Sequence, residues 1–584
     1  MRAPCFARFP TEHLDKMNAM HSAASRPTPA TTINTTNAAN VETNPFIGLT
    51  YGQSLRLIAD RFGEREALVM DGRRWTFHAA LAEIDRASAR LLAAGFRPGD
   101  KLALWMPNRP EFLWYWLGAA QIGMLAVVIN TRLKGQEVAY QVAQSDSRAV
   151  IVPGDGAFKD FIGDIASFRA ELPALEHVIA LDPTVHPDVL DWSRPDNTDE
   201  TENAKDIQSG PLPLAEDPEA PALISYSSGT TGLPKGALIA HSVFRKAWDI
   251  GMYTDQTEND RLLLAIPLFG SLAMMNGVLP FWTRGGAIVV MERFTPQAFL
   301  DLAAQERCTM THLLPPMIVA LETLPHAEVR SKLATMRTAN VVSLDHSIFR
   351  LVTDKLGIPG AIIGYGLTES TTVAVRNRWD DPAEARMTSQ GHPLPGIELR
   401  IVDPETGAIC GAGTPGEIQL RGYCIMKGYY NKPEETRQAV DTDGWFHTGD
   451  FGVVRDDGRL SFLYRYSDGY KTNGFNISPS DVEAVVRQHP DVVDTAVFGQ
   501  DDPVAGQVGV ACVVLSGAAR DSFDEAAFLA FLREHLPSYK VPRHVVPVES
   551  LPVTAGTGKV QKFQLRKMVE HLLPVRNLAS RATA

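Results

Sequence analysis

The sequence predicts a layered α/β protein with a second, smaller α+β domain at its C-terminal end. Short apolar runs alternate with longer helical stretches over most of the 584 residues, a pattern typical of largely parallel sheets covered by helices on both faces. At about 100 to 200 residues per domain, a chain of this length holds several hydrophobic cores. After about Arg465 the pattern changes to strands and short amphipathic helices, which indicates a separate small domain.

The first elements of the large domain follow from the spacing of apolar residues. Leu81, Ile84, Leu91 and Leu92 recur at helical spacing, and Gly95 comes shortly after them, as glycine does at helix ends. Further along, we expect an apolar helix at 112–122 and strands at 101–106, 125–129, 149–152, 178–181 and 287–291. The Pro-, Asp- and Glu-rich segment between residues 183 and 221 is predicted to be an exposed insertion.

One uncharged stretch, residues 262–282, is about long enough to cross a bilayer. It contains Pro267 and Pro280 as well as glycines and an asparagine, which interrupt a single spanning helix. We therefore expect a buried strand, a loop and a buried helix here, and no integral membrane segment.

The small domain has clear local signals of its own. Ser478 followed by Pro479 is typical of a helix start, and Val482, Val485 and Val486 then lie on one face of that helix. Strands at 492–498 and 508–515 and an amphipathic helix at 525–536 complete the predicted domain.

Composition excludes several classes of protein. The 56 basic and 68 acidic residues give a net charge of −12, which disfavours a partner bound through its phosphate backbone, so no nucleic acid is expected. Five widely spaced cysteines without a Cys-x-x-Cys pair disfavour a disulfide scaffold or a structural zinc site. The first residues lack the apolar run of a secretory signal. We expect a cytoplasmic protein with a disordered leader over residues 1–45.

The strongest chemical signal is the segment YSSGTTGLPKG at 226–236, directly after the apolar run Ala222-Leu223-Ile224. Glycines, hydroxyl side chains and one lysine in a short loop offer many hydrogen-bond donors to a polyphosphate. A Walker loop requires glycine before its lysine and Ser or Thr after it. Here Pro234 precedes Lys235 and Gly236 follows, so the P-loop NTPase interpretation fails.

Together with GYGLTE at 364–369, WFHTGD at 445–450, LYRYSDGYKTNG at 463–474 and LPVTAGTGKVQK at 551–562, this loop resembles the adenylate-forming superfamily of acyl-CoA synthetases, adenylation domains and luciferases. The resemblance covers the chain from about Leu49 to Lys567. It implies an adenylation domain at 46–464, a mobile C-terminal domain at 465–575 and a tail at 576–584. It also implies an ATP site where the two domains meet.

The same resemblance implies roles for individual residues. Tyr365 would stack on adenine, Thr368 would contact phosphate, Glu369 would help to hold Mg²⁺, Asp450 would accept the ribose hydroxyls, and Arg465 at the hinge would contact ribose and phosphate. Lys559 would neutralise charge during adenylation, with Thr231 and Glu369 also at the reacting phosphates. The loop that holds the β- and γ-phosphates would comprise Ser227, Ser228, Gly229, Thr230, Thr231, Gly232 and Lys235.

The resemblance implies two further roles, a catalytic one for Lys471 and a coenzyme A contact for Gly474. Lys471 matches a lysine that some CoA ligases place near the adenylate, although an exposed surface lysine fits the sequence equally well. Gly474 would lie on the path of coenzyme A.

The predicted acyl pocket departs from the family pattern. We place Phe269, Gly270, Asn340 and Gly366 in this pocket, with Gly270 where the family usually has histidine. The strand 338–343 is bulkier and more polar than usual, and Tyr464 and Ser467 depart from the usual hinge. The apolar segments 268–275 and 312–317 fit an acyl tunnel or simple core packing equally well. The expected acid is therefore an unusual one.

The predicted function is an AMP-forming acid:CoA ligase that uses ATP, Mg²⁺ and coenzyme A to activate a small carboxylic acid. Alternatives on the same scaffold are an adenylation enzyme that loads a carrier-protein thiol, a luciferase-like oxygenase, and a non-catalytic ATP-binding interaction protein. A homodimer is left open as the oligomeric state.

Overall fold

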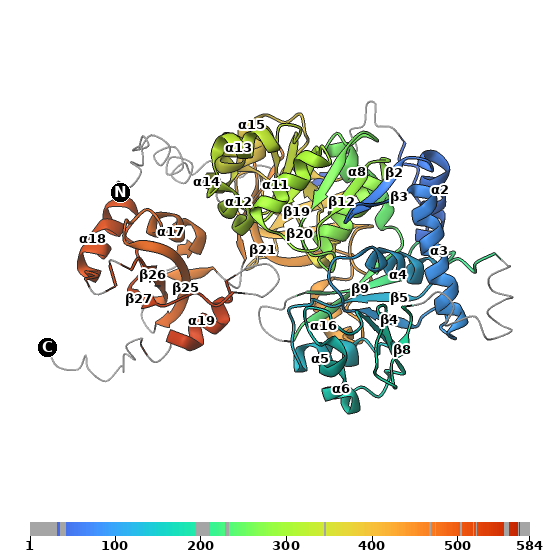
Figure 1. Ribbon diagram of the computed structural model, residues 1–584. Helices are drawn as coiled ribbons and strands as arrows, with labels where there is room; N and C mark the ends of the chain where they lie inside the picture. The colour runs from blue at the N-terminus through green and yellow to red at the C-terminus, as the bar shows by residue number, and fades with distance from the viewer. Residues whose placement is uncertain are drawn as a thin grey trace.

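The computed structural model describes residues 32–34, 43–193, 211–227, 233–343, 346–465, 469–472, 475–502, 505–517, 519–520, 522–553, 560–569 and 572. A large body holds four sheets, and a smaller body from residue 469 onward holds the fifth (Figure 1).

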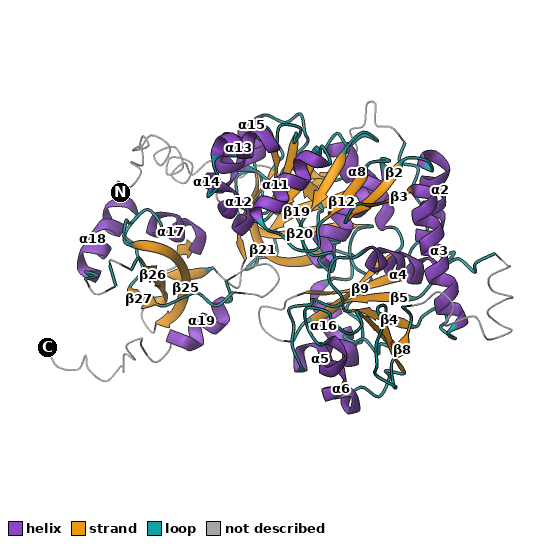
Figure 2. Cartoon of the chain, in the orientation of Figure 1, coloured by secondary structure: helices purple, strands orange, loops and turns teal. Residues whose placement is uncertain are grey.

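The first sheet is largely parallel and is buried on both faces, because helices cover it on each side (Figure 2). Its strands run in the order β10-β9-β5-β4-β6-β7-β8, and only β10 is antiparallel to its neighbour. The strands are β4 (Lys101–Leu104), β5 (Leu125–Val128), β6 (Ala149–Val152), β7 (His177–Ala180), β8 (Leu190–Asp191), β9 (Pro221–Ser227) and β10 (Lys235–Ala240). The helices are α2 (Tyr51–Phe62), α3 (Phe77–Ala93), α4 (Pro110–Gln121), α5 (Gln136–Gln144), α6 (Phe161–Phe168), η1 (Arg169–Glu171) and α8 (Val243–Tyr253).

The second sheet is also mainly parallel and runs in the order β15-β14-β13-β11-β12-β2-β3. Its strands are β2 (Glu66–Met70), β3 (Arg73–Thr76), β11 (Arg261–Leu264), β12 (Ala287–Val290), β13 (Met310–Leu313), β14 (Thr338–Val341) and β15 (Gly360–Ile362). The helical segments that follow its strands are α9 (Ser271–Ala273), η3 (Met274–Val278), α10 (Leu279–Thr283), α11 (Pro296–Gln305), α12 (Pro315–Glu322), α13 (His326–Lys332), α14 (His346–Arg350) and η4 (Leu351–Lys355).

The uncharged stretch 262–282 forms β11, the short helix α9, a π-helical turn and α10, and most of its residues are buried, which confirms the predicted strand, loop and helix. Among the described residues, every helix is too short or too polar to span a bilayer.

The third sheet is antiparallel and includes a hairpin with its turn around Asp457. Its order is β1-β19-β20-β21-β22, and Gly458 adopts the left-handed φ of 78° that the turn requires. The pairing of β21 with β22 contains a β-bulge: Asp450 faces Arg465 and Phe451 faces Tyr464, but Gly452 faces Phe462, so Leu463 is the extra residue. The strands are β1 (Thr32–Asn34), β19 (Ile397–Val402), β20 (Gly416–Gly422), β21 (Phe446–Val454) and β22 (Leu460–Arg465).

A small antiparallel sheet, β16-β17-β18, lies beside the third sheet. Its strands are β16 (Gly364–Tyr365), β17 (Val375–Arg376) and β18 (His392–Pro393), and the nearby helical segments are η5 (Thr368–Ser370), α15 (Ala383–Thr388) and α16 (Pro433–Ala439).

The small domain has the predicted α+β composition. Its sheet runs β24-β23-β26-β25, with β27 parallel to β26. Val482 and Val486 are fully buried and Val485 is nearly so, as expected from their spacing on one helix face. Its elements are β23 (Tyr470–Thr472), β24 (Phe475–Ile477), α17 (Pro479–Val486), β25 (Val492–Asp502), β26 (Gly506–Leu515), α18 (Glu525–His535), β27 (His544–Val548) and α19 (Lys562–Val569).

Three local expectations differ from the structure. Within the predicted leader, Thr32–Asn34 forms β1 on the open edge of β19, because an edge strand offers unpaired backbone groups to any extended segment. Within the predicted exposed insertion, β8 pairs with β7, and Trp192 is buried beneath Arg90. Ser478 precedes α17 as predicted, but its hydroxyl contacts the Ser480 hydroxyl and makes no capping bond to the helix backbone.

Candidate active site

The strongest sequence motif lies on a hairpin at the edge of the first sheet. Ser227 ends β9 and faces Lys235, the first residue of β10, across the antiparallel pair. Residues Ser228, Gly229, Thr230, Thr231 and Gly232 connect the two strands and lie outside the described residues. The Lys235 ammonium lies 5.1 Å from the ring centre of Tyr429, so the end of the motif lies against the segment that carries this tyrosine.

Glu369 is buried beside that tyrosine. The Tyr429 hydroxyl donates to Oε1 of Glu369 at 2.9 Å, and the Met426 backbone N–H donates to the Glu369 carbonyl at 2.7 Å. Burial and the Glu369 charge raise the pKa of the Tyr429 hydroxyl, so the tyrosine remains a donor. No hydrogen bond is formed by Oε2 of Glu369 within the described part of the chain, which leaves this oxygen available to a cation.

Asp450 lies at the centre of a second buried group. Tyr365 donates its hydroxyl proton to Oδ2 of Asp450 at 2.9 Å, and the Arg465 Nε–H donates to Oδ1 at 2.8 Å. The Tyr365 ring also stacks on Phe462, with ring centres 5.7 Å apart and planes inclined by 26°. Each carboxylate oxygen has two lone pairs, so Asp450 can still accept hydrogen bonds from a ligand.

Arg465 connects these two groups electrostatically. Burial raises the pKa of both the Tyr365 and the Tyr429 hydroxyls, and the Arg465 charge opposes this rise at both. Its guanidinium therefore acts on the Asp450 group and the Glu369 group together. Two cations, Lys235 and Arg465, and two anions, Glu369 and Asp450, are thus arranged around one region of the large domain.

The loop that carries Thr368 and Glu369 is held in an unusual backbone conformation. Thr371 and Thr372 adopt left-handed φ angles of 57° and 77°, which are costly for threonine. Gly366 precedes them, and a Cβ at this position would lie 2.1 Å from the Thr372 carbonyl oxygen. Behind the loop, the fully buried Lys246 of α8 donates to the carbonyl oxygens of Ser370, at 3.1 Å, and Thr371.

Tyr429 and Lys246 were not among the residues predicted from the sequence. Tyr429 follows Lys427-Gly428 in a segment without a periodic signal, and Lys246 lies in an amphipathic helix where a lysine is normally exposed. Only the packing of distant segments shows their positions. Tyr365, Thr368, Glu369, Asp450 and Arg465 were predicted. Hydrogen bonds bring Tyr365, Asp450 and Arg465 together, Glu369 is bonded to Tyr429, and Thr368 is half-buried in η5.

Other predicted residues lie elsewhere or outside the described residues. Lys471 donates to Oε1 of Glu405 at 2.7 Å, an exposed ion pair between the small and the large domain. Gly474 and Lys559 lie outside the described residues, so their roles stay predictions.

Three of the four residues assigned to the acyl pocket occupy the second sheet and its connections, whereas Gly366 lies between β16 and η5. Asn340 is buried in β14, Gly270 precedes α9, and Phe269 packs half-buried against the main core. Asn340 accepts a hydrogen bond from Arg376, a buried arginine that was not predicted. Residues 268–275 and 312–317 include fully buried apolar side chains, among them Met274 and Leu313, which belong to the main core.

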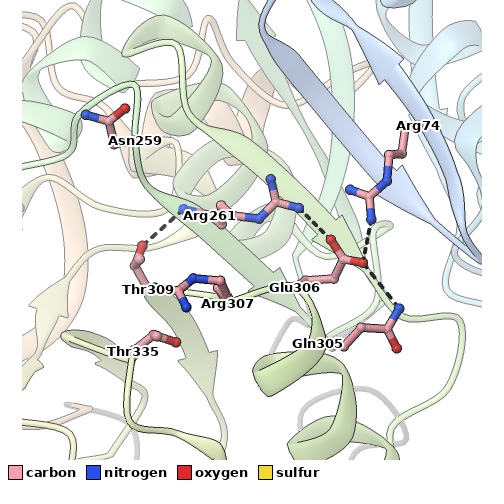
Figure 3. Close-up of a pocket in the computed structure, with 8 residues that line it drawn as sticks. All are labelled: Arg74, Asn259, Arg261, Gln305, Glu306, Arg307, Thr309 and Thr335. Atoms are coloured by element: carbon pink, nitrogen blue, oxygen red, sulfur yellow. Dashed lines mark hydrogen bonds and ion pairs between the residues drawn. The ribbon is translucent and has the colours of Figure 1, made fainter.

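A separate hollow of about 390 Å³ lies near the N-terminal ends of β11 and β13 (Figure 3). Two of its arginines share carboxylates: Arg74 and Arg261 both bond Glu306 and Glu66. Because these charges compensate one another and none of the predicted site residues lines this hollow, it is not the candidate site. Among the described residues, no three potential metal-ligating side chains gather anywhere.

Comparison with known proteins identifies relatives that match most of the chain. Residues 55–430 match the profile of the AMP-binding enzyme family, and residues 481–559 match the AMP-binding enzyme C-terminal domain. The mitochondrial medium-chain acyl-CoA ligase ACSF2 of Bos taurus is 28% identical over 552 residues, which cover 90% of this chain and 88% of the relative.

Solved structures give the same result. The anthranilate CoA ligase AuaEII, in complex with anthranoyl-AMP, superposes with a TM-score of 0.77 at 26% identity and covers 90% of this chain and 98% of its own. ATP-bound MatB from Rhodopseudomonas palustris superposes with a TM-score of 0.76 at 26% identity, over 90% of this chain and all of its own.

Proposed function

The chain belongs to the AMP-binding enzyme family as an acyl-CoA synthetase, and from this premise we propose that it joins a carboxylic acid to coenzyme A through an acyl-adenylate. In the first half-reaction, a carboxylate oxygen attacks the α-phosphorus of ATP and pyrophosphate leaves. In the second, the thiol of coenzyme A loses its proton, its sulfur attacks the acyl carbon, and AMP leaves.

The observation that carries the proposal is the Asp450 group. A buried carboxylate held by Tyr365 and Arg465 is fixed in position before any ligand arrives, which reduces the entropy lost when two neighbouring hydroxyls bind it. We assign Asp450 to the ribose hydroxyls, with Arg465 close enough to donate to ribose or phosphate. Tyr365 would contact adenine with the ring face that Phe462 does not cover.

On the phosphate side, we assign the β- and γ-phosphates to the loop from Ser227 to Lys235. Glu369 fits a Mg²⁺ ion that also binds phosphate oxygens, because Mg²⁺ usually takes one or two carboxylates together with phosphate and water. When bound, the ion supplies charge neutralisation at the phosphates. The Tyr429 hydroxyl holds the Glu369 carboxylate in place for this purpose.

Two lysines of the small domain are assigned to the two half-reactions. Lys559 would approach the α-phosphate while negative charge develops during adenylation, where one preorganised cation contributes about 3 to 4 kcal/mol. Lys471 and Gly474 are assigned to the thiol half, which requires a rotation of the small domain between two poses. In the present pose Lys471 is held by Glu405 on the large domain.

The test is ATP–pyrophosphate exchange across a panel of carboxylic acids, followed by mass detection of the thioester. Exchange together with a CoA thioester is the expected result. If exchange occurs without a CoA thioester and an added carrier protein is acylated, the thiol acceptor is a carrier protein and not coenzyme A. Silence with every acid, despite measured ATP binding, would leave an ATP-binding protein without this activity.

A further inference from the structure

Arg376 is a buried cation in the region assigned to the acyl group. It ends β17 and is only 2% exposed. Its Nη1 donates to Oδ1 of Asn276 at 3.0 Å, and its Nη2 donates to Oδ1 of Asn340 at 3.2 Å. The three residues come from β17, the π-helical turn 274–278 and β14, so three separate segments position one guanidinium.

Within the described part of the chain, no acidic side chain forms an ion pair with Arg376. Other partly or largely buried arginines do have such partners: Arg337 pairs with Asp260, and Arg465 pairs with Asp450. In the hollow of Figure 3, Arg261 even has two. Burial lowers the pKa of Arg376 to about 10, so the side chain remains charged at neutral pH.

A buried charge held only by neutral amides is costly, since burial removes its hydration and amide oxygens replace it incompletely. The neighbouring polar atoms are also unsatisfied. Arg376 Nε and Asn276 Nδ2 are buried without a hydrogen-bond partner in the described structure. His312 is buried beside them, and its ring interacts with the Asn276 backbone. His312 faces Asn340 in the register of β13 and β14.

These unsatisfied groups are mostly donors. Burial, and then the charge of Arg376, lower the pKa of His312 to about 3, so the imidazole is neutral and carries one N–H. A guanidinium Nε–H and an amide N–H, on two side chains that already contact each other, match the acceptor oxygens of a carboxylate. An apolar acyl chain would leave both of them unpaired.

We propose that Arg376, together with Asn276 and Asn340, binds a second carboxylate at the far end of the substrate, so that the enzyme activates dicarboxylic acids. The inference rests on the proposed function and specifies its substrate class. Arg376 faces Gly364 across the β16–β17 pair, one residue before Tyr365. The proposed carboxylate site and the nucleotide residue Tyr365 therefore belong to the same small sheet, so one acid could extend from Arg376 to the nucleotide.

The experiment compares unbranched dicarboxylic acids of increasing length with monocarboxylic acids of the same length, by ATP–pyrophosphate exchange. In the wild type, kcat/KM is expected to favour the best dicarboxylate over its monocarboxylate partner by at least about tenfold. Asn276→Asp gives the guanidinium an internal carboxylate of nearly unchanged shape and should lower this ratio about 100-fold. Arg376→Leu should lower it at least as much.

Arg378→Leu is the matched control, because Arg378 lies two residues further on and is half exposed; it should leave the ratio unchanged. If Arg376→Leu fails to fold, Asn276→Asp decides. A wild-type preference for monocarboxylates, or an equal fall for both acids in Asn276→Asp, overturns the inference while the ligase function stands. Silence with all acids overturns the proposed function and the inference with it.

Discussion

The proposed nucleotide region and the proposed acyl region of the large domain differ in how their buried charges are compensated. In the former, Asp450 is paired with Arg465, and Glu369 is held by Tyr429 near Lys235. In the latter, two amide oxygens are the hydrogen-bond partners of Arg376 among the described residues. A self-compensated site suits one ligand shared by a whole family, whereas an uncompensated charge selects among acids. The difference suggests that specificity resides where the fold leaves charge unbalanced.

The largest expected effect concerns a cation that the nucleotide region itself does not supply. Its two cations and two anions balance, so the triphosphate needs Mg²⁺ and a further positive charge. Lys559→Ala is expected to slow acyl-adenylate formation about 100- to 1,000-fold, measured by pyrophosphate exchange. Formation of the thioester from added acyl-adenylate should change little. Lys471→Ala is the comparison variant; if it alone slows adenylation, the two lysines are assigned the wrong way round.

Asp450→Asn tests the compensated region directly. It keeps the shape of the side chain but removes the charge that Arg465 pairs with and that the ribose would use. We expect the KM for ATP to rise about 10- to 100-fold, which corresponds to the loss of about 1.5 to 3 kcal/mol. Asp457→Asn, in the exposed turn of the same hairpin, should stay within about twofold of wild type. Equal effects of the two variants would contradict the ribose assignment.

Tyr429→Phe removes only the hydroxyl that orients Glu369. The expected result is a rise of about 3- to 10-fold in the Mg²⁺ concentration needed for half-maximal exchange. Glu369→Gln should raise it further. A change in the KM for the acid, with the Mg²⁺ dependence unaltered, would place Tyr429 on the acyl side.

The last prediction concerns the stability of the fold, not its activity, and the buried Lys246. Burial lowers its pKa from the ordinary value of 10.5 to about 7. Between these two values the unfolded chain binds one more proton than the folded chain. The free energy of unfolding should therefore rise by up to about 1.4 kcal/mol per pH unit above pH 7, and this contribution should be absent below pH 7. Urea unfolding of Lys246→Met should show a shallower rise than wild type between pH 7 and 9.5. If the free energy of unfolding depends on pH equally in the two proteins, the Lys246 ammonium is solvated in the folded state.

Much of the fold could be predicted because the signals are local. The apolar runs at 149–152 and 287–290 are strands, and Arg148 and Gly286 directly precede them. Asp450 and Arg465 could be expected to meet because one tight turn separates them. The burial of Arg376 could not be predicted. A single arginine after Val373-Ala374-Val375 gives the same local sequence pattern whether the strand lies at an exposed edge or in a core. Its environment depends on Asn276 and Asn340, which are distant in sequence.

The bulge in β22 has a consequence for how tolerant this hairpin is to change. Side chains three residues apart point to opposite faces of a regular strand. Yet Phe462 stacks on Tyr365, and Arg465 reaches the aspartate that the same tyrosine bonds. The extra residue Leu463 restores their common face, and its carbonyl oxygen accepts a hydrogen bond from Ser480 of the small domain at 3.4 Å. Position 463 should therefore accept many side chains but no insertion. The number of residues between Phe462 and Arg465 is what keeps the two side chains on the same face of the strand.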